Sequence, residues 1–114
     1  VWDKVLSLNL FPQKVYDTEI KYYLTKQNKF GLPLDSRKAY TKNDWILWTA
    51  TFAPTQKEFE ALVKPVYTHA IETESRVPLN DFYDSNTGIR DNFKARSVVG
   101  GFYMRLFSDK LKAK

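Results

Sequence analysis

The stretch TQKEFEALVKPVYTHAI, residues 55–71, indicates the fold class more clearly than any other part of the chain. It opens on a capping-box pattern, in which Thr55 caps the first turn of a helix and Glu58 reaches back to it. Apolar residues then recur at offsets of three and four, the spacing of one helix face; they are Phe59, Leu62, Val63, Val66, Tyr67, Ala70 and Ile71. Pro65 lies inside this stripe, and we expect it to kink the helix because it removes a backbone hydrogen bond.

Similar patterns on both sides of this stretch predict further helices over residues 2–10, 12–28, 41–52 and 102–111. The third of these opens on a second capping-box pattern, from Thr41 to Asp44, and it is apolar nearly all round, which favours a buried helix. Helices joined by connectors recur along the chain, an order typical of stacked helical hairpins. The sequence therefore predicts a single all-α unit spanning residues 1–114.

Composition narrows the classes of function. The chain has 114 residues and a formal charge of +5, but its basic residues are interleaved with acidic ones, which argues against nucleic acid as a partner. It has no cysteine, so disulfides and cysteine-based metal sites are excluded. No apolar run is long enough for a membrane span. The chain opens on Val1-Trp2-Asp3, inside an expected helix, so we expect a piece of a longer protein.

The segment SRVPLNDFYDSNTGIRDNFKARSVVGG, residues 75–101, separates two helical stretches. Loops of this length are uncommon in compact domains and are often functional. Residues 80–90 form a possible small β-hairpin that turns at DSNTG, residues 84–88. The DSNTG turn departs from a calcium-binding EF-hand loop, and the single histidine, His69, has no metal-binding partners in the sequence, so no metal and no cofactor is indicated.

Several residues around these connectors are candidates for a site, and each also has a structural interpretation. Asp81 and Asp84 are spaced like a catalytic carboxylate pair, although the start of an Asx turn explains Asp84 better. Asp35, Arg37 and Asp44 lie where a cavity mouth is expected, although a helix cap and a local ion pair explain them as well. The arginines of the long segment suit either a clamp for a ligand carboxylate or ties from the loop to nearby carbonyls.

Three stretches of the chain resemble the C-terminal all-helical region of the glutaminase A family. They are WDKVLSLNLFP, YYLTKQNKFGLPLDSRKAYTKNDWILWTA and SRVPLNDFYDSNTGIRDNFKARSVVGGFYMRL, and together they cover nearly the whole chain. The resemblance implies helical hairpins that form part of an (α/α) toroid similar to six-hairpin glycosidases. It also implies upstream domains in the same chain, export from the cell, and hydrolysis of L-glutamine to L-glutamate and ammonia.

The site residues that we expect lie inside the matching motifs. Asp44, Asp81 and Asp84 are the catalytic candidates, and the substrate-binding candidates are Asp35, Arg37, Trp45, Arg76, Tyr83 and Arg96. In an amide hydrolase a carboxylate activates water and an arginine holds the substrate carboxylate; Asp44 or Asp81 is the expected base, and Arg76 or Arg96 the expected clamp.

Two other functions stay open at this point. One is a carbohydrate-active enzyme on the same toroid, with two carboxylates as acid and base and Trp45, Trp48 or Tyr83 stacking on a sugar. The other is a non-catalytic helical module that packs against other domains. In either case we expect the 114 residues alone to be inactive and to self-associate, because a part of a toroid exposes faces meant for other hairpins.

Overall fold

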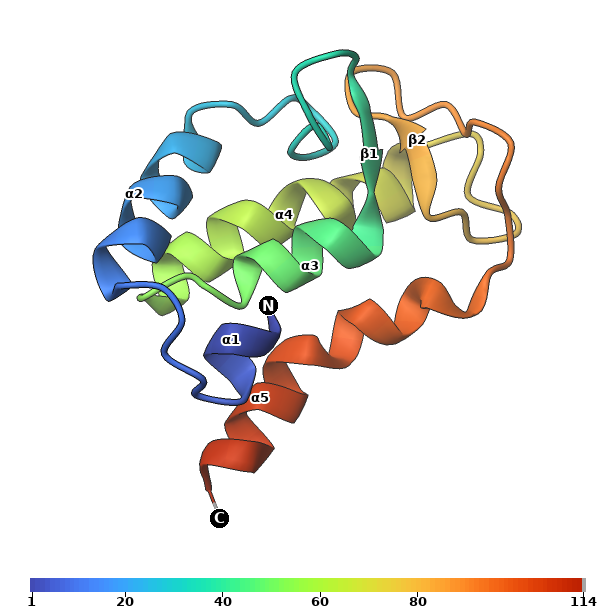
Figure 1. The fold of residues 1–114 in the computed structure, drawn as a ribbon. Coiled ribbons are helices and arrows are strands. Elements are labelled where there is room, and N and C mark those ends of the chain that lie inside the picture. The colour runs from blue at the N-terminus through green and yellow to red at the C-terminus, as the bar shows by residue number, and fades with distance from the viewer. Residues whose placement is uncertain (114) are drawn as a thin grey trace.

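The computed structural model describes residues 1–113, most of which are helical or lie in loops between helices (Figure 1). The helices are α1 (Trp2–Val5), α2 (Gln13–Leu24), α3 (Asn43–Ala50), α4 (Gln56–Glu72) and α5 (Met104–Lys112). A 3₁₀ helix over Ser97–Tyr103 runs directly into α5. Two short strands, β1 (Tyr40–Lys42) and β2 (Phe82–Asp84), complete the fold.

Helix α3 lies at the centre of this arrangement. It packs against α4, against the 3₁₀ helix and against α5, while α2 packs on the N-terminal half of α4 (Figure 1). Two buried apolar clusters fill the spaces between these helices: Ile20, Ala50, Ala53 and Leu62 form one, and Leu32, Ile46, Leu47 and Val66 form the other. Tyr23 and Val63 pack against both clusters, so they join the two halves of the core.

Helix α4 begins as the capping box predicts. The Thr55 side chain accepts a hydrogen bond from the backbone N–H of Glu58 at 3.2 Å, and the Thr55 hydroxyl donates to the Glu58 carboxylate at 2.6 Å. The buried face differs from the predicted stripe, however. Leu62, Val66 and His69 are the buried residues of α4, whereas Tyr67 and Ile71 are exposed. His69 is therefore buried on the face where the apolar pattern predicted Tyr67 and Ile71.

The predicted start of α3 is wrong. Thr41 does not cap the helix but belongs to β1, where its buried hydroxyl donates a hydrogen bond to the carbonyl of Leu32. The helix begins two residues later, at Asn43. The first two helices are also shorter than predicted, because α1 ends at Val5 and α2 ends at Leu24.

The two strands are antiparallel, with Tyr40 opposite Asp84, Thr41 opposite Tyr83 and Lys42 opposite Phe82. Thr41 and Tyr83 are buried, whereas their neighbours in both strands are partly exposed, so the sheet has an inner and an outer face. The predicted hairpin over residues 80–90 is confirmed around its turn, where Tyr83 forms an antiparallel bridge with Arg90 and backbone hydrogen bonds join residue 84 to 89 and 91 to 82. The main partner of β2 is β1, from a distant part of the sequence.

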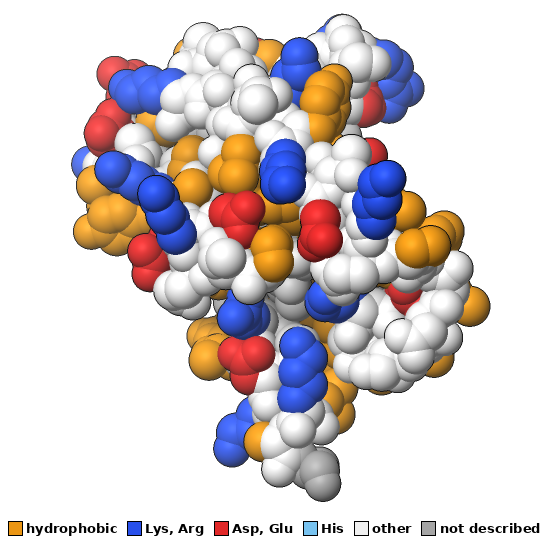
Figure 2. All heavy atoms as spheres, turned by 90° about the vertical axis from the view of Figure 1, so that its left-hand side faces the viewer, with side chains coloured by type: hydrophobic (Ala, Val, Ile, Leu, Met, Phe, Trp, Pro, Cys, Tyr) orange, Lys and Arg blue, Asp and Glu red, His pale blue; other side chains and the backbone are white. Residues whose placement is uncertain are grey.

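The surface mixes charged and apolar side chains. On the face in Figure 2, Lys and Arg side chains are spread among acidic and apolar ones and form no continuous basic stripe. Among residues 1–113, no helix combines the length and the apolar character that crossing a membrane requires.

Candidate functional site

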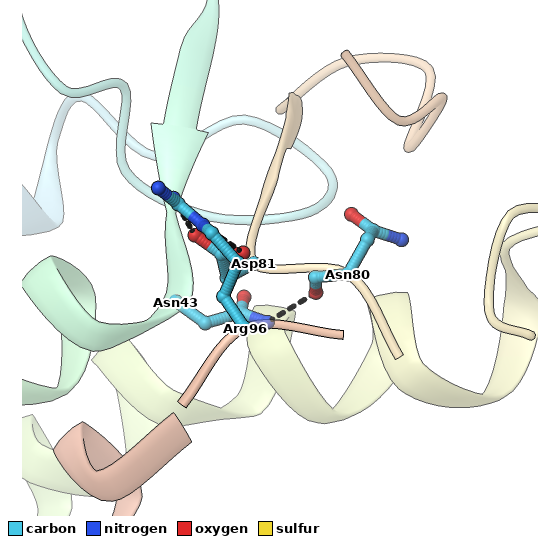
Figure 3. Close-up of polar contacts among 4 residues, drawn as sticks. All are labelled: Asn43, Asn80, Asp81 and Arg96. Atoms are coloured by element: carbon cyan, nitrogen blue, oxygen red, sulfur yellow. Dashed lines mark hydrogen bonds and ion pairs between the residues drawn. The ribbon is translucent and has the colours of Figure 1, made fainter. Parts of the chain in front are cut away.

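The long loop and the start of α3 meet at an ion pair between the buried Asp81 and the partly exposed Arg96. Asp81 is 2% exposed, and the guanidinium of Arg96 donates to both of its carboxylate oxygens: Nε to Oδ1 at 3.0 Å, and Nη2 to Oδ2 in a short contact (Figure 3). Two parallel hydrogen bonds to one carboxylate fix its orientation as well as its charge. The other face of Arg96 lies 3.9 Å from the ring centre of Phe93. Asp81 therefore raises the pKa of Arg96.

Two asparagines hold the backbone on either side of this pair. The backbone N–H of Asn43 donates to the carbonyl of Asp81 at 3.0 Å, and the Asn43 side chain donates to the carbonyl of Asn80 at 3.0 Å (Figure 3). The Asn80 side chain donates in turn to the carbonyl of Ser75 at 2.8 Å. Both asparagines are almost fully buried, so the entry of the long loop is fastened to the first turn of α3.

Asp44 lies next to this frame and is 6% exposed. Burial raises the pKa of its carboxyl above the ordinary value, and the negative charge of Asp81 raises it further, against backbone N–H groups that lower it. Its Oδ1 atom is buried with no hydrogen-bond partner among the described residues. Within residues 1–113, Asp44 is thus a buried carboxyl group without a side-chain hydrogen-bond partner at Oδ1, near a second carboxylate that Arg96 neutralises.

Asp35 and Arg37 form a separate, more exposed pair. Arg37 Nη2 donates to Asp35 Oδ2 at 2.6 Å, and the Arg37 backbone N–H donates to Oδ1 at 2.8 Å. These hydrogen bonds lower the pKa of Asp35 to about 2. The pair lines a cavity of about 280 Å³ on the outer face of the sheet; its lining residues are Leu34, Asp35, Arg37, Lys38, Tyr40 and Phe82.

Trp45 follows Asp44 in α3 but points elsewhere. It is 51% exposed and contributes to the wall of a second cavity, of about 190 Å³, together with Tyr23 and Leu34. Its ring lies 6.1 Å from that of Trp48. Trp45 therefore shares a cavity wall with Leu34, which also lines the Asp35–Arg37 cavity, but it is not among the contacts of the Asp81–Arg96 pair.

Tyr83 lies in the interior. It is fully buried, its hydroxyl donates to the carbonyl of Phe30 at 2.9 Å, and its ring stacks on His69 with centres 3.5 Å apart. His69 Nε2 lies 3.1 Å from the carbonyl of Gly88, so this nitrogen carries the proton, and burial lowers the pKa of the ring to about 4. His69 and Tyr83 are therefore buried packing residues of one group.

Asp84 and Arg76 both make local structural contacts. The Asp84 carboxylate accepts from the backbone N–H groups of Asn86 and Thr87 at 2.8 and 3.0 Å, which confirms the Asx turn. Arg76 donates to the carbonyl of Thr73 at 2.7 Å, at the C-terminal end of α4. Asp84 is therefore turned into its own loop, away from the buried carboxyl groups.

Nine residues were expected to line one site, and the structure divides them. Asp44, Asp81 and Arg96 come together inside the fold, Asp35 and Arg37 line the outer cavity, and Trp45, Arg76, Tyr83 and Asp84 lie elsewhere. Sequence reasoning missed Lys38, Tyr40 and Phe82 as cavity residues. The alternation of partly exposed and buried residues in YTK and FYD appears in the structure, but three residues are too few to show a strand's period of two in the sequence. Among residues 1–113, no three His, Asp or Glu side chains are placed to share a metal ion.

Comparison with known protein families decides the family. The model of the glutaminase A six helical-hairpin domain matches residues 1–106. The chain belongs to the glutaminase A family. Glutaminase A of Aspergillus oryzae is 39% identical over 107 residues, which cover 91% of this chain and 15% of that protein. A protein of Arthroderma benhamiae named as a probable glutaminase is 37% identical over 103 residues, 87% of this chain and 12% of its own length.

This glutaminase A family chain thus spans about one seventh or less of the length of these two relatives. No solved structure matches it. The resemblance drawn from GLPLDSR, YTKNDW and ARSVVGG is confirmed, and the structure gives these motifs a physical meaning. GLPLDSR supplies the outer cavity, while YTKNDW and ARSVVGG supply Asp44 and Arg96 around Asp81.

Proposed function

We propose that the protein containing these 114 residues hydrolyses L-glutamine to L-glutamate and ammonia. The match of residues 1–106 to the glutaminase A domain carries this proposal, because the two relatives are named as glutaminases. The geometry supports an amide hydrolase in one respect. It places a carboxyl group with a raised pKa, Asp44, beside a carboxylate whose position is fixed by an arginine.

Asp44 is the proposed general acid–base group. Attack of water on an amide carbon requires a base to take a proton from the water, and departure of ammonia requires an acid to donate one. A carboxyl group is most effective in both steps when its pKa lies close to the working pH, and burial moves Asp44 in that direction. Asp81 acts through its charge, because it raises the pKa of Asp44 while Arg96 holds it in place.

The test is the substitution Asp44→Asn in the full-length protein. We expect kcat for L-glutamine to fall about 10²–10⁴-fold, the usual contribution of a general acid–base group. The melting temperature should be unchanged or higher, because an amide of the same shape costs less to bury than a carboxylate. Asp109→Asn is the matched control, since Asp109 is exposed on α5 and, among residues 1–113, its carboxylate pairs with Arg105. Full glutamine turnover by both Asp44→Asn and Asp81→Asn would disprove the scheme.

The surrounding architecture is part of the same proposal. We propose that this segment supplies C-terminal hairpins and a closing helix to an (α/α) toroid in an exported protein. The family domain is described as six helical hairpins, and α2, α3 and α4 account for fewer than that. An exposed apolar face on α5 and the preceding 3₁₀ helix supports additional packing partners; it consists of Phe102, Tyr103, Leu106 and Phe107. Such faces are uncommon on monomers unless they bind something.

A further inference from the structure

A glutamine-binding site needs a group that holds the substrate's α-carboxylate, and two expected candidates are already engaged. Arg96 makes two hydrogen bonds to Asp81, and Arg76 donates to the end of α4. Arg37 differs from both in its position, because it lines the outer cavity. Like Arg76, it bonds through a single side-chain nitrogen, here Nη2 to Asp35, and a guanidinium has five N–H donors. Arg37 therefore has donors left for a ligand in the cavity that it lines.

The backbone holds this cavity in a defined shape. The N–H of Leu34 donates to the carbonyl of Tyr40 at 2.7 Å and closes the connector into a loop over the outer face of the sheet. Inside the loop, the Arg37 backbone N–H bonds to the Asp35 carboxylate, which orients both side chains. Tyr40 and Phe82, from the two strands, have ring centres 5.4 Å apart and form an apolar floor. A preformed loop reduces the ordering cost of binding a small ligand.

The charges around the cavity are of both signs. Asp35 is an anion at any physiological pH, because Arg37 holds its pKa at about 2. Arg37 and Lys38 are cations, and the Lys38 ammonium lies 5.4 Å from the centre of the Tyr40 ring. A complementary ligand has a carboxylate for Arg37 and Lys38, an ammonium for Asp35 and a short carbon chain for the apolar floor.

We infer that the cavity of about 280 Å³ between the Leu34–Tyr40 loop and the sheet binds the zwitterionic headgroup of an α-amino acid. Arg37, assisted by Lys38, takes the α-carboxylate, and Asp35 takes the α-ammonium. Leu34, Tyr40 and Phe82 contact the carbon chain. This inference rests on the proposed glutaminase function, because it assigns the substrate-binding part of that activity. Phe82, one of the two rings of the cavity floor, directly follows Asp81 in the sequence.

Direct binding to three compounds that the enzyme does not hydrolyse tests each contact separately in the full-length protein. L-glutamate carries the whole headgroup, glutarate lacks the α-ammonium, and 4-aminobutanoate lacks the α-carboxylate. Isothermal titration calorimetry measures the Kd of each compound for the wild type and for Arg37→Gln and Asp35→Asn. Arg105→Gln and Asp109→Asn are the matched controls, because they make the same changes in an exposed ion pair on α5.

Each variant should weaken only the compounds that carry its partner group. Arg37→Gln should raise the Kd of L-glutamate and glutarate about tenfold or more, a loss of about one charge-assisted contact, and leave 4-aminobutanoate within about twofold. Asp35→Asn should weaken L-glutamate and 4-aminobutanoate but leave glutarate unchanged. If Asp35 merely positions Arg37, the same variant weakens glutarate as well, and the ammonium contact is wrong. Failure of the wild type to bind L-glutamate, or equal losses for all three compounds, would overturn the assignment.

Glutamine turnover, measured separately, distinguishes this inference from the proposed function. A protein that shows the expected binding pattern but releases no ammonia from L-glutamine has the headgroup site without the glutaminase activity. A protein that hydrolyses L-glutamine with an unchanged KM in Arg37→Gln has the activity, and its headgroup site lies elsewhere. Arg37 is largely exposed, so its substitution leaves the core intact.

Discussion

Gly101 lies directly against Asp44. A Cβ atom at position 101 would sit 2.6 Å from Cβ of Asp44 and 2.7 Å from its Cα, well inside contact distance. The 3₁₀ helix can approach the first turn of α3 this closely only because residue 101 has no side chain. Close packing against Asp44 explains the second glycine of the ARSVVGG motif.

Gly101→Ala should therefore destabilise the fold, whereas Gly100→Ala should not. The added methyl group meets the α3 backbone, which cannot move aside as a flexible side chain can, and overpacking of this kind costs about 1–3 kcal/mol. No atom lies within 4 Å of a Cβ built at Gly100, so that variant is the matched control. Urea denaturation of both variants measures the difference. Equal stability of the two variants would contradict the close contact.

Loss of the Arg96 charge should be costly. Arg96→Met leaves the buried Asp81 carboxylate without its partner; breaking a fully buried pair costs about 3 kcal/mol or more, and a smaller loss is expected here because Arg96 is 31% exposed. Arg105→Met is the control, because its pair with Asp109 is exposed and is worth less than about 1 kcal/mol. The double variant Asp81→Asn/Arg96→Met should regain part of the loss, since no unpaired charge remains. A double-mutant cycle of unfolding free energies measures this coupling.

Stability should fall as the pH drops from about 6.5 to about 4, because of His69. Burial lowers the pKa of His69 in the folded chain to about 4, whereas an unfolded histidine has a pKa of about 6.5. The unfolded state therefore binds a proton that the folded state does not, and about 2–3 kcal/mol is lost by pH 4. His69 is the only histidine of the chain, so NMR titration of its ring gives the folded pKa directly. In His69→Gln this part of the pH dependence should disappear; an unchanged profile would show that other groups cause it.

The 114-residue chain on its own should self-associate through α5. Tyr103 is 66% exposed and Leu106 is 64% exposed, on the side of the helix opposite the buried Met104 and Ser108. Sedimentation velocity should show that Tyr103→Ser/Leu106→Gln shifts the chain towards the monomer. Val77→Ser is the control, because Val77 is 82% exposed in the long loop and lies outside this face. A monomeric wild-type chain would refute the prediction.

The helices were predictable where local signals and burial agree. The Thr55–Glu58 box and the face of α2 that contains Ile20 follow from patterns that packing supports. The second box failed because Thr41 has a stronger alternative, a buried strand position with Leu32 as its partner. Local capping patterns cannot register a pairing between residues 41 and 83, which depends on the whole fold.

The sequence identified some residues of the candidate site but not their arrangement. Motif position brought out Asp44, Asp81 and Arg96, and they do come together. Nothing local distinguishes Asp81, which is buried, from Asp84, which bonds to its own turn. The difference arises from β2, which begins directly after Asp81 and ends at Asp84, because its pairing with β1 places the two carboxyl groups in different surroundings.

Strand β1 ends at Lys42 and helix α3 begins at Asn43, with no linker between them. The Leu34–Tyr40 loop and the buried carboxyl group of Asp44 are therefore carried on one continuous length of backbone. We therefore expect a displacement of β1 to move the first turn of α3 as well, because no flexible linker separates them.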